Sequence, residues 1–346
     1  MRAVGSERSC CFTVRADVGN PASDRWPRRN VSSVGWRFLL ATVIGLALVG
    51  SATADRRGLP RVVASFSVNS PVAIVVGAGS VWVSAGEAVV RIDPRTDRVV
   101  ARIPVPGWSG GIAVADGVVW VARNPVDTTG VARPGWLWSI NTATNRVFGK
   151  PVRLALPTQI AASAGSLWVT NGNHGIYGRV FRVDPVRRLI VATVKVPGGP
   201  EGIVAEGGSL WVAASDSGNL VRIDPRTDAV VGPALHVRGA LVTITAIGDR
   251  LWVGDNYSGA VLQVNPTTPT NAFVTRTPLS GVTDIAADGT GVWATTAGPS
   301  QLVELDPRTG ATAGRPIPMP AGAFRLALGF SSIWVITAHA VIRIQT

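Results

Sequence analysis

The chain has 346 residues, of which 46% are hydrophobic and only 16% are charged, so it can bury a large core. The formal net charge is +12, and the basic residues are almost all arginine, because the only lysines are Lys150 and Lys195. After the first 54 residues these charges are scattered, with no run of like sign and no basic stripe interleaved with stacking aromatics. The composition therefore argues against nucleic acid as a partner.

Residues 1–54 have the composition of an Arg-rich leader followed by a signal peptide. Residues 38–50 form an apolar run that is short for a membrane-spanning helix, which needs about 20 residues. The sequence Ala52-Thr53-Ala54 fits the small-x-small cleavage pattern. We expect cleavage after Ala54 and a secreted or extracytoplasmic protein, with an uncleaved membrane tether as the alternative. Both cysteines precede the apolar run, so residues 55–346 have no disulfide and must be held by their core and by chain closure.

A tryptophan recurs along residues 55–346 at gaps of 38, 48, 43, 41, 41 and 41 residues, which is typical of a repeat architecture. Each repeat contains four short apolar segments, and no stretch after residue 60 shows helical periodicity. In the fourth repeat the segments are 202–205, 210–214, 220–223 and 229–237. The recurring residues are Trp82, Trp120, Trp168, Trp211, Trp252, Trp293 and Trp334.

The turn between the third and fourth segments has a chemical signature. Asp93 can accept a backbone N–H at the first position of a type I turn, and Pro94 presets the second position. The residue that follows must tolerate a left-handed conformation. Most repeats carry a tolerant residue there, but two depart from the pattern and weaken the turn argument. The tolerant residues are Asp97, Asn145, Asp228 and Gly310, and the departures are Arg188 and Pro269.

The last repeat is one segment short, and the missing segment is found at the other end of the chain. Residues 61–68 resemble 98–105, the fourth segment of the first complete repeat. A strand at 61–68 that completes the C-terminal sheet would close the ring. The sequence therefore predicts an all-β, seven-bladed β-propeller with four-stranded blades over residues 55–346. We expect the repeated tryptophans to pack between blades, and Arg95, Arg226 and Arg308 to be solvated turn residues, with anion binding as the alternative.

The repeat text GSLWV…GxLVRIDPRTDxVV resembles that of bacterial YVTN-type propellers and, more distantly, virginiamycin B lyase-like propellers, over about residues 61–346. The resemblance implies a seven-bladed and often exported protein. It also implies, for the lyase branch, elimination of a cyclic lactone ester by His and Glu side chains with Mg²⁺ at the central opening. Here no Glu stands three residues after any repeated Trp, and no His stands eleven residues before one. We therefore assign no catalytic or metal-binding residue, and expect Mg²⁺ only if the protein is lyase-like.

We expect functional residues at positions where the repeats differ. Packing of the scaffold requires similar residues at equivalent positions, whereas ligand binding does not. In a propeller the loops between second and third strands share one face with the links between blades. We call this the loop face, and the innermost strands add side chains toward the central channel. The candidate ligand-binding residues are Trp108, Arg123, loop 124–134, His174, Tyr177, Glu201, Asp216, Asp255, Asn256, Tyr257 and His339 on the loop face, with Gln159, Asp284 and Arg325 toward the channel.

These features favour a monomeric, exported binding module without a resident cofactor, which recognises a small molecule, a cell-envelope component or a protein. The first alternative is a metal-assisted lyase or hydrolase at the channel mouth. In that case His174 or His339 would act as general base, with Glu201 or Asp284 as partner or metal ligand. The second alternative is a structural platform for protein interactions, which would have a flat, apolar loop face.

Overall fold

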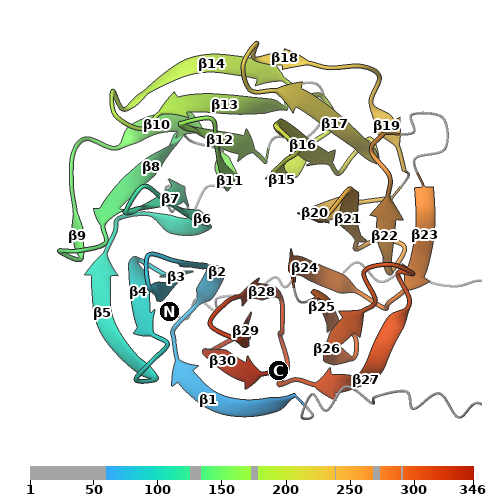
Figure 1. The fold of residues 1–346 in the computed structure, drawn as a ribbon. Helices are drawn as coiled ribbons and strands as arrows, with labels where there is room; N and C mark the ends of the chain where they lie inside the picture. The colour runs from blue at the N-terminus through green and yellow to red at the C-terminus, as the bar shows by residue number, and fades with distance from the viewer. Residues whose placement is uncertain (1–59, 125–133, 173–177, 238, 268–272, 290) are drawn as a thin grey trace, which may run out of the picture. The chain divides into compact units, whose positions relative to one another are not determined.

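The computed structural model describes residues 60–124, 134–172, 178–237, 239–267, 273–289 and 291–346. These residues form thirty β-strands in seven sheets, which surround a central channel as the blades of a propeller (Figure 1). Among them no helix is long and apolar enough to cross a membrane. The chain divides into Met1–Asp55 and Arg56–Thr346, and all described residues belong to the second unit. The prediction of a seven-bladed, all-β propeller is confirmed.

We number the blades in chain order, and each runs from its innermost to its outermost strand. Blade 1 consists of β2 Pro71–Gly77, β3 Ser80–Ala85, β4 Ala88–Asp93 and β5 Arg98–Pro104. Blade 2 consists of β6 Trp108–Ala115, β7 Val118–Asn124, β8 Pro134–Asn141, β9 Arg146–Val147 and β10 Val152–Ala155. Blade 3 consists of β11 Pro157–Ser163, β12 Ser166–Asn171, β13 Arg179–Asp184 and β14 Leu189–Lys195. Blade 4 consists of β15 Pro200–Glu206, β16 Ser209–Ala214, β17 Asn219–Asp224, β18 Ala229–Val230 and β19 Leu235–His236. Blade 5 consists of β20 Leu241–Ile247, β21 Arg250–Asp255, β22 Ala260–Val264 and β23 Phe273–Pro278, and blade 6 of β24 Val282–Asp288, β25 Gly291–Ala297, β26 Ser300–Leu305 and β27 Thr312–Pro318. Blade 7 consists of β28 Arg325–Leu328, β29 Ser332–Ile336, β30 Ala340–Gln345 and β1 Arg61–Ser67.

Blade 7 is shared between the two ends of the described chain, as the sequence predicts (Figure 1). Strand β1 pairs antiparallel with β30, with Val62 opposite Ile344 and Phe66 opposite Val341. The ring of Phe66 is buried and stacks on Trp334 of the same blade, with ring centroids 6.0 Å apart. The N-terminal strand therefore contributes both the outer edge of blade 7 and part of its core.

Each repeated tryptophan is buried and packs against the second strand of the next blade, which confirms the predicted role in the core. Trp120 of blade 2 clusters with Leu167 of blade 3, and Trp211 of blade 4 clusters with Leu251 of blade 5. Trp334 of blade 7 clusters with Val81 of blade 1 in the same way across the closure. One wide aromatic side chain per blade therefore fills the space between neighbouring sheets.

The outermost strand of blade 4 differs from the prediction. The sequence suggests one segment over 229–237, whereas the structure has two short strands, β18 and β19, which both pair with β17. Gly232 between them has a left-handed φ of 70°, and Pro233 has no N–H with which to continue the ladder. The break is therefore local and leaves the blade complete.

The predicted turn chemistry is present between the third and fourth strands. Oδ1 of Asp93, Asp184, Asp224 and Asp306 accepts the backbone N–H two residues later, at 2.7–2.8 Å. Hydrogen bonds from backbone N–H groups two or three residues later, as the largest cause, lower the pKa of all four carboxyl groups. Asp97, Asn145, Asp228 and Gly310 have φ angles of 52–75°, and Arg188 also adopts this conformation with a φ of 58°. Arg188 is thus no exception to the turn, while Pro269 lies outside the described residues.

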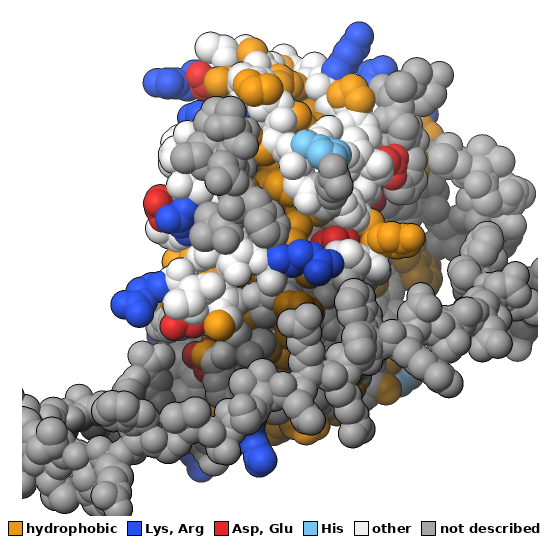
Figure 2. All heavy atoms as spheres, turned by 90° about the vertical axis from the view of Figure 1, so that its right-hand side faces the viewer, with side chains coloured by type: hydrophobic (Ala, Val, Ile, Leu, Met, Phe, Trp, Pro, Cys, Tyr) orange, Lys and Arg blue, Asp and Glu red, His pale blue; other side chains and the backbone are white. Residues whose placement is uncertain are grey.

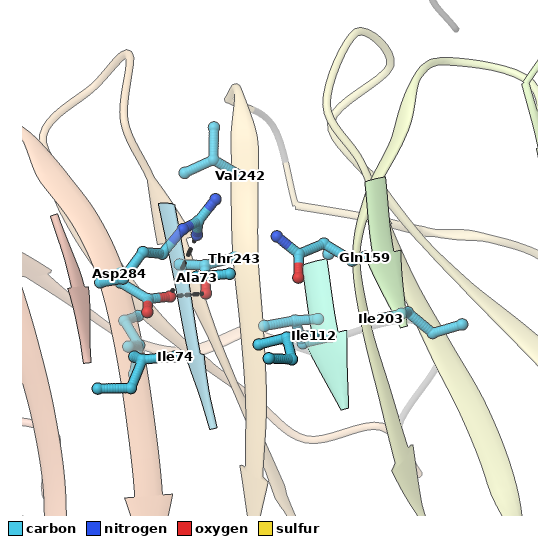
Figure 3. Close-up of a pocket in the computed structure, with 12 residues that line it drawn as sticks. Ala73, Ile74, Ile112, Gln159, Ile203, Val242, Thr243 and Asp284 are labelled. Atoms are coloured by element: carbon cyan, nitrogen blue, oxygen red, sulfur yellow. Dashed lines mark hydrogen bonds and ion pairs between the residues drawn. The ribbon is translucent and has the colours of Figure 1, made fainter. Parts of the chain in front are cut away.

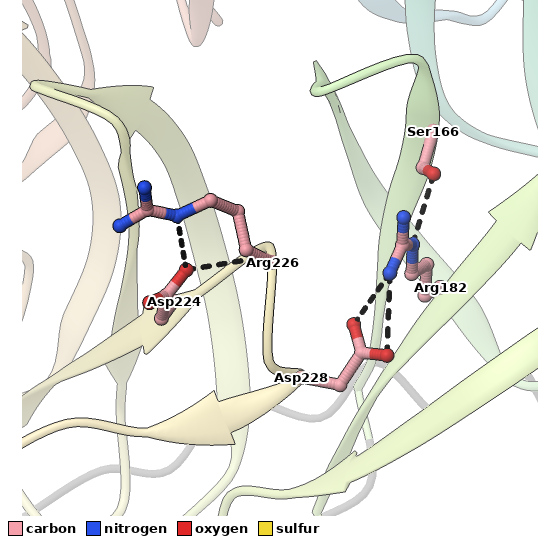
Figure 4. A network of polar contacts seen from close by, with 5 residues as sticks. All are labelled: Ser166, Arg182, Asp224, Arg226 and Asp228. Carbon is pink, nitrogen blue, oxygen red and sulfur yellow. Dashed lines mark hydrogen bonds and ion pairs between the residues drawn. The ribbon is translucent and has the colours of Figure 1, made fainter.

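A contact between neighbouring blades, which we call the inter-blade latch, explains several of the repeated residues. In blade 3, Arg182 lies opposite Trp168 on the adjacent strand, with its guanidinium carbon 5.5 Å from the indole centroid. It donates to Oγ of Ser166 at 2.9 Å and to Asp228 in the turn of blade 4 at 3.0 Å (Figure 4). Blades 1 and 7 repeat the latch through Arg91 with Asn145 and Arg343 with Asp97.

The latch between blades 2 and 3 is reversed, and this reversal accounts for Arg188. In blade 2 the residue opposite Trp120 is Ser139 rather than arginine. The turn of blade 3 supplies the arginine instead: Arg188 lies 5.4 Å from the Trp120 centroid and donates to Oγ of Ser139 at 2.7 Å. Burial lowers the pKa of the Arg188 guanidinium. Trp120 therefore also has a guanidinium over its ring, but the arginine belongs to the neighbouring blade 3 and not to the same blade as the tryptophan.

The surface charges are dispersed on the side of the molecule that Figure 2 presents. Blue, red and uncharged side chains are interspersed there, and the visible Lys and Arg side chains do not form one continuous field. Arg226, in the turn of blade 4, is an example: its side chain is 84% exposed, and its ion-pair partner is Asp224 of the same turn. An exposed pair of this kind contributes little to stability.

We expect the closure of the ring to depend on Phe66. The change Phe66→Ala removes a buried aromatic side chain and should reduce the free energy of unfolding by about 3–5 kcal/mol. Val63→Ala on the same strand is the matched control, because Val63 is 39% exposed. Urea denaturation followed by tryptophan fluorescence measures both variants. Equal losses for the two variants would contradict a closure based on core packing.

We expect the reversed latch to be convertible into the ordinary one. Arg188→Asp alone should destabilise the protein by about 1–2 kcal/mol, because the stacking cation and its hydrogen bond are lost. Adding Ser139→Arg rebuilds the arrangement found in blades 1, 3 and 7 and should recover part of that loss. Thermal unfolding of the wild type, both single variants and the double variant gives the coupling energy. Arg226→Ala, at an exposed turn position, should be nearly neutral. Strictly additive effects would show that the two positions do not interact.

Candidate functional site

The seven innermost strands β2, β6, β11, β15, β20, β24 and β28 line the channel, and one equivalent position in them varies strongly (Figure 1). The position lies nine residues before each repeated tryptophan, and the residue after it is Ile in six blades and Leu326 in blade 7. In six blades a bulge or irregularity in the strand pairing adjoins this position. Bulges of this kind redirect side chains next to functional sites. The variable residues are Ala73, Gly111, Gln159, Gly202, Thr243, Asp284 and Arg325.

A cavity of about 130 Å³ lies at this level, and we call it the channel pocket. All seven innermost strands contribute to its wall, which combines an apolar ring of isoleucines with a few polar side chains. The polar group of Gln159 lies across the pocket from Thr243 and Asp284, which point toward one another (Figure 3). The lining residues are Ala73, Ile74, Ile112, Gln159, Gly202, Ile203, Val242, Thr243, Ile244, Asp284, Ile285 and Arg325.

Asp284 is the only acidic residue in the described lining, and its carboxylate is held by three donors. Oδ1 accepts from Oγ1 of Thr243 at 2.7 Å and from Nη1 of Arg325 at 3.5 Å, and Oδ2 accepts from the backbone N–H of Leu326 at 3.0 Å. Asp284 is 8% exposed, so these partners compensate for the water that its charge has lost. Thr243 belongs to blade 5, Asp284 to blade 6, and Arg325 and Leu326 to blade 7. The carboxylate therefore joins three consecutive blades.

Two polar side chains of the channel pocket keep hydrogen-bonding capacity. Within the part of the chain that the structure describes, the hydrogen bond to Asp284 is the only one made by the Arg325 guanidinium. The Arg325 side chain is 28% exposed. The side-chain amide of Gln159 forms no hydrogen bond with any described residue. Next to it, a Cβ on Gly111 would collide with the backbone oxygen of Thr158, so glycine there allows β6 and β11 to approach closely.

The loop face is formed as predicted, because the turns between second and third strands bond to the links between blades. Examples are the N–H of Gly86 to the oxygen of Ser70 at 3.0 Å and that of Ala297 to Gly281 at 2.8 Å. Five candidate residues are exposed on this face, of which Trp108 is 52% and Tyr257 is 87% exposed. The other exposed candidates are Asp216, Asn256 and His339. His174, Tyr177 and most of the loop 124–134 lie outside the described residues.

Arg123 was expected on the loop face as a ligand-binding residue, but the structure buries it completely. Its guanidinium donates to the backbone oxygens of Gly86, of Ala88 at 2.8 Å and of Gly107 at 3.2 Å. Burial lowers the pKa of Arg123 to about 10, which leaves it charged at neutral pH. Arg123 thus joins a turn of blade 1 to the link before blade 2. It is a structural residue and does not face a ligand.

Asp255 is likewise 2% exposed and acts within the protein. Its Oδ1 accepts from the backbone N–H groups of Ala240, Tyr257 and Ser258 at 3.0–3.1 Å, which shapes the loop after β21. Glu201 on β15 is partly buried, and its backbone oxygen accepts from Thr170 of blade 3 at 3.0 Å. Neither residue lines the channel pocket. Of the sequence candidates that the structure describes, Gln159, Asp284 and Arg325 are brought together there.

Sequence reasoning missed Thr243, Ala73 and the isoleucine ring. The signal that could have found them is the variable position nine residues before each tryptophan, since small residues there leave space and polar ones fill it. The group expected for a lyase-like protein, Mg²⁺, does not fit the described residues. No three His, Cys, Asp or Glu side chains in them are grouped closely enough to hold a metal ion.

We expect Asp284 to stabilise the junction of blades 5, 6 and 7. Asp284→Ala leaves the N–H of Leu326 and the hydroxyl of Thr243 without their partner, which should cost about 1–3 kcal/mol of unfolding free energy. Asp288→Ala is the control, because Asp288 ends the same strand away from the channel pocket. Chemical denaturation measures both variants. A loss for Asp284→Ala no larger than that of the control would contradict this role.

Comparison with known proteins identifies the fold. No family model matches the chain, and no curated protein does. Among solved structures, virginiamycin B lyase from Staphylococcus aureus is similar with a TM-score of 0.68 at 17% identity, over 83% of this chain and 99% of that one. A streptogramin B lyase matches at 0.66 and 15% identity over 82% and 97%, and BamB from Moraxella catarrhalis at 0.59 and 13% over 84% and 98%. The chain is a seven-bladed β-propeller with the fold that these lyases share.

Proposed function

We propose that this chain is a binding module that takes a small molecule into the channel pocket from the loop face. The observation that supports this most directly is the pocket itself, where residues of all seven innermost strands converge. The residues that differ between repeats are gathered at this level, while the flanking isoleucines are nearly constant. An apolar wall with a few converging polar groups is the usual form of a small-molecule site.

The position of the pocket supports entry from the loop face. Each innermost strand begins at a link on this face, and the variable residue comes within a few positions of that beginning. Trp108 and Tyr257 are exposed on the same face, so a longer ligand, a cell-envelope component or a protein segment could extend over them. We propose that the module acts outside the cytoplasm, because residues 1–54 have the composition of an export leader.

A lyase activity is the second candidate, and the similar structures favour considering it. One of them is a virginiamycin B lyase made catalytically inactive by a histidine-to-alanine change and solved with quinupristin. In the present chain the described lining of the channel pocket contains no histidine. Its one carboxylate, that of Asp284, already accepts hydrogen bonds from Thr243, Arg325 and Leu326. Binding therefore explains the described residues better than elimination does.

We expect Ala73→Leu to abolish binding in the channel pocket without unfolding the protein. Ala73 lines the pocket, and three added carbon atoms would fill much of its volume. The matched control is Ala155→Leu, at an exposed position of an outer strand. A fragment set of small acids, amines, amides and sugars is screened against both variants and the wild type by ligand-observed NMR. The fragments that bind the wild type should bind the control and be lost with Ala73→Leu.

Thermal unfolding of the Ala73→Leu variant checks that the ring is intact. If its fragments bind as they bind the wild type, the pocket is not the binding site. If no fragment binds the wild type at all, the proposal of a small-molecule module fails.

A further inference from the structure

We infer that the channel pocket recognises its ligand through a carboxylate, which pairs with Arg325. This inference rests on the proposed function and specifies the chemical class of the ligand. It follows from a difference in hydrogen bonding between the two charged residues of the pocket, Asp284 and Arg325. Asp284 accepts hydrogen bonds from three donors, whereas most donors of the Arg325 guanidinium have no described partner.

The contact between Arg325 and Asp284 is a single, long one. Nη1 lies 3.5 Å from Oδ1, and the same oxygen takes a shorter hydrogen bond from Thr243 at 2.7 Å. A guanidinium has five N–H donors arranged as a flat fork, which matches two carboxylate oxygens side by side. Asp284 thus positions Arg325 without using that fork. The edge of the guanidinium that is left is suited to a second carboxylate.

The surroundings of Arg325 leave space for such a group. On one side it neighbours Asp284 of β24, and on the other side β28 lies next to β2, which places Ala73 at the equivalent position. The side chain of Ala73 is small, so it takes up little of the space in that part of the ring. The cavity of about 130 Å³ is large enough for a small ligand group. It can hold a carboxylate and one or two neighbouring groups.

Gln159 supplies a second point of recognition across the channel pocket (Figure 3). Its side-chain amide offers both a donor and an acceptor, and isoleucines flank the space between. A carboxylate with an amide or hydroxyl close to it would satisfy both ends. This chemistry is found in small hydroxy or N-acyl acids and in the C-terminus of a peptide. A phosphate dianion fits less well, because its two negative charges are repelled more strongly by the neighbouring carboxylate of Asp284 than the single charge of a carboxylate ligand.

The overall charge of +12 would attract anions without any specific site, so the test must separate the two effects. N-acetylglycine is the small-acid probe, and N-acetylglycinamide is its neutral isostere. N-acetyl-triglycine presents the same carboxylate as a peptide C-terminus, and inorganic phosphate tests the anion type. Each probe is titrated by NMR into the wild type and into Arg325→Gln, Arg325→Lys and Gln159→Leu. The matched control is Arg226→Gln, at an exposed turn on the opposite face.

We expect Arg325→Gln to raise the Kd for N-acetylglycine at least tenfold, while Arg226→Gln leaves it unchanged. Arg325→Lys should fall between the two, because it keeps the charge and loses the fork. The neutral amide should bind the wild type at least tenfold more weakly than the acid. Gln159→Leu should also raise the Kd for N-acetylglycine, but by a smaller factor than Arg325→Gln does. Tighter binding of N-acetyl-triglycine than of N-acetylglycine would support a peptide end, and the reverse order a small free acid.

Three results would overturn the inference. Equal binding of acid and amide, both lost with Ala73→Leu, would leave the channel as the binding site but refute the carboxylate. Loss of affinity with Arg226→Gln equal to that with Arg325→Gln would show unspecific attraction of anions, as would phosphate binding as tightly as N-acetylglycine. Absence of any probe or fragment from the channel would refute the proposed function together with the inference. Thermal unfolding of each variant confirms that a lost affinity does not reflect an unfolded ring.

Discussion

Ring closure by β1 is the constraint on which the remaining structure depends. Each blade buries its tryptophan against the next blade, so an open ring would expose one such surface at blade 1 and leave β30 as an unpaired edge. The pairing of β1 with β30 and the stacking of Phe66 on Trp334 remove both defects. The same closure brings β28 beside β2 and so sets Arg325 next to Ala73. The channel pocket therefore exists only in the closed ring.

The architecture could be predicted from the sequence because its signals are local and repeated. The tryptophan period, the turn residues and the likeness of 61–68 to 98–105 each lie within one repeat, and together they specify seven blades and their closure. The channel candidates Gln159, Asp284 and Arg325 could be found for the same reason. What could not be predicted is burial that depends on other blades. Arg123 has the charge of a ligand residue, but its partners are backbone oxygens of the preceding blade that only the folded ring brings to it. Asp255 also looks like a ligand residue, but its carboxylate is used by the backbone of its own blade.

The arrangement around Asp284 also decides how the pocket can be used. A carboxylate that accepts hydrogen bonds from both neighbouring blades is held in one position. Its neighbour Arg325 has further donors without a described partner, and we propose that a ligand uses them. A propeller that shares the lyase fold can in this way present a recognition site, because fold and chemistry are separable: the scaffold supplies the strands and the variable position supplies the groups.

The reversed latch has a consequence for how interchangeable the blades are. Blade 3 carries arginine both opposite Trp168 and in its own turn, whereas blade 2 carries arginine at neither place. Moved behind any blade that already has an arginine over its tryptophan, blade 3 would set two guanidinium groups against one indole. Although the repeats look alike in sequence, the residues at the interfaces between blades thus match only in the native order. A propeller with shuffled or duplicated blades would need matched substitutions on both sides of each new interface.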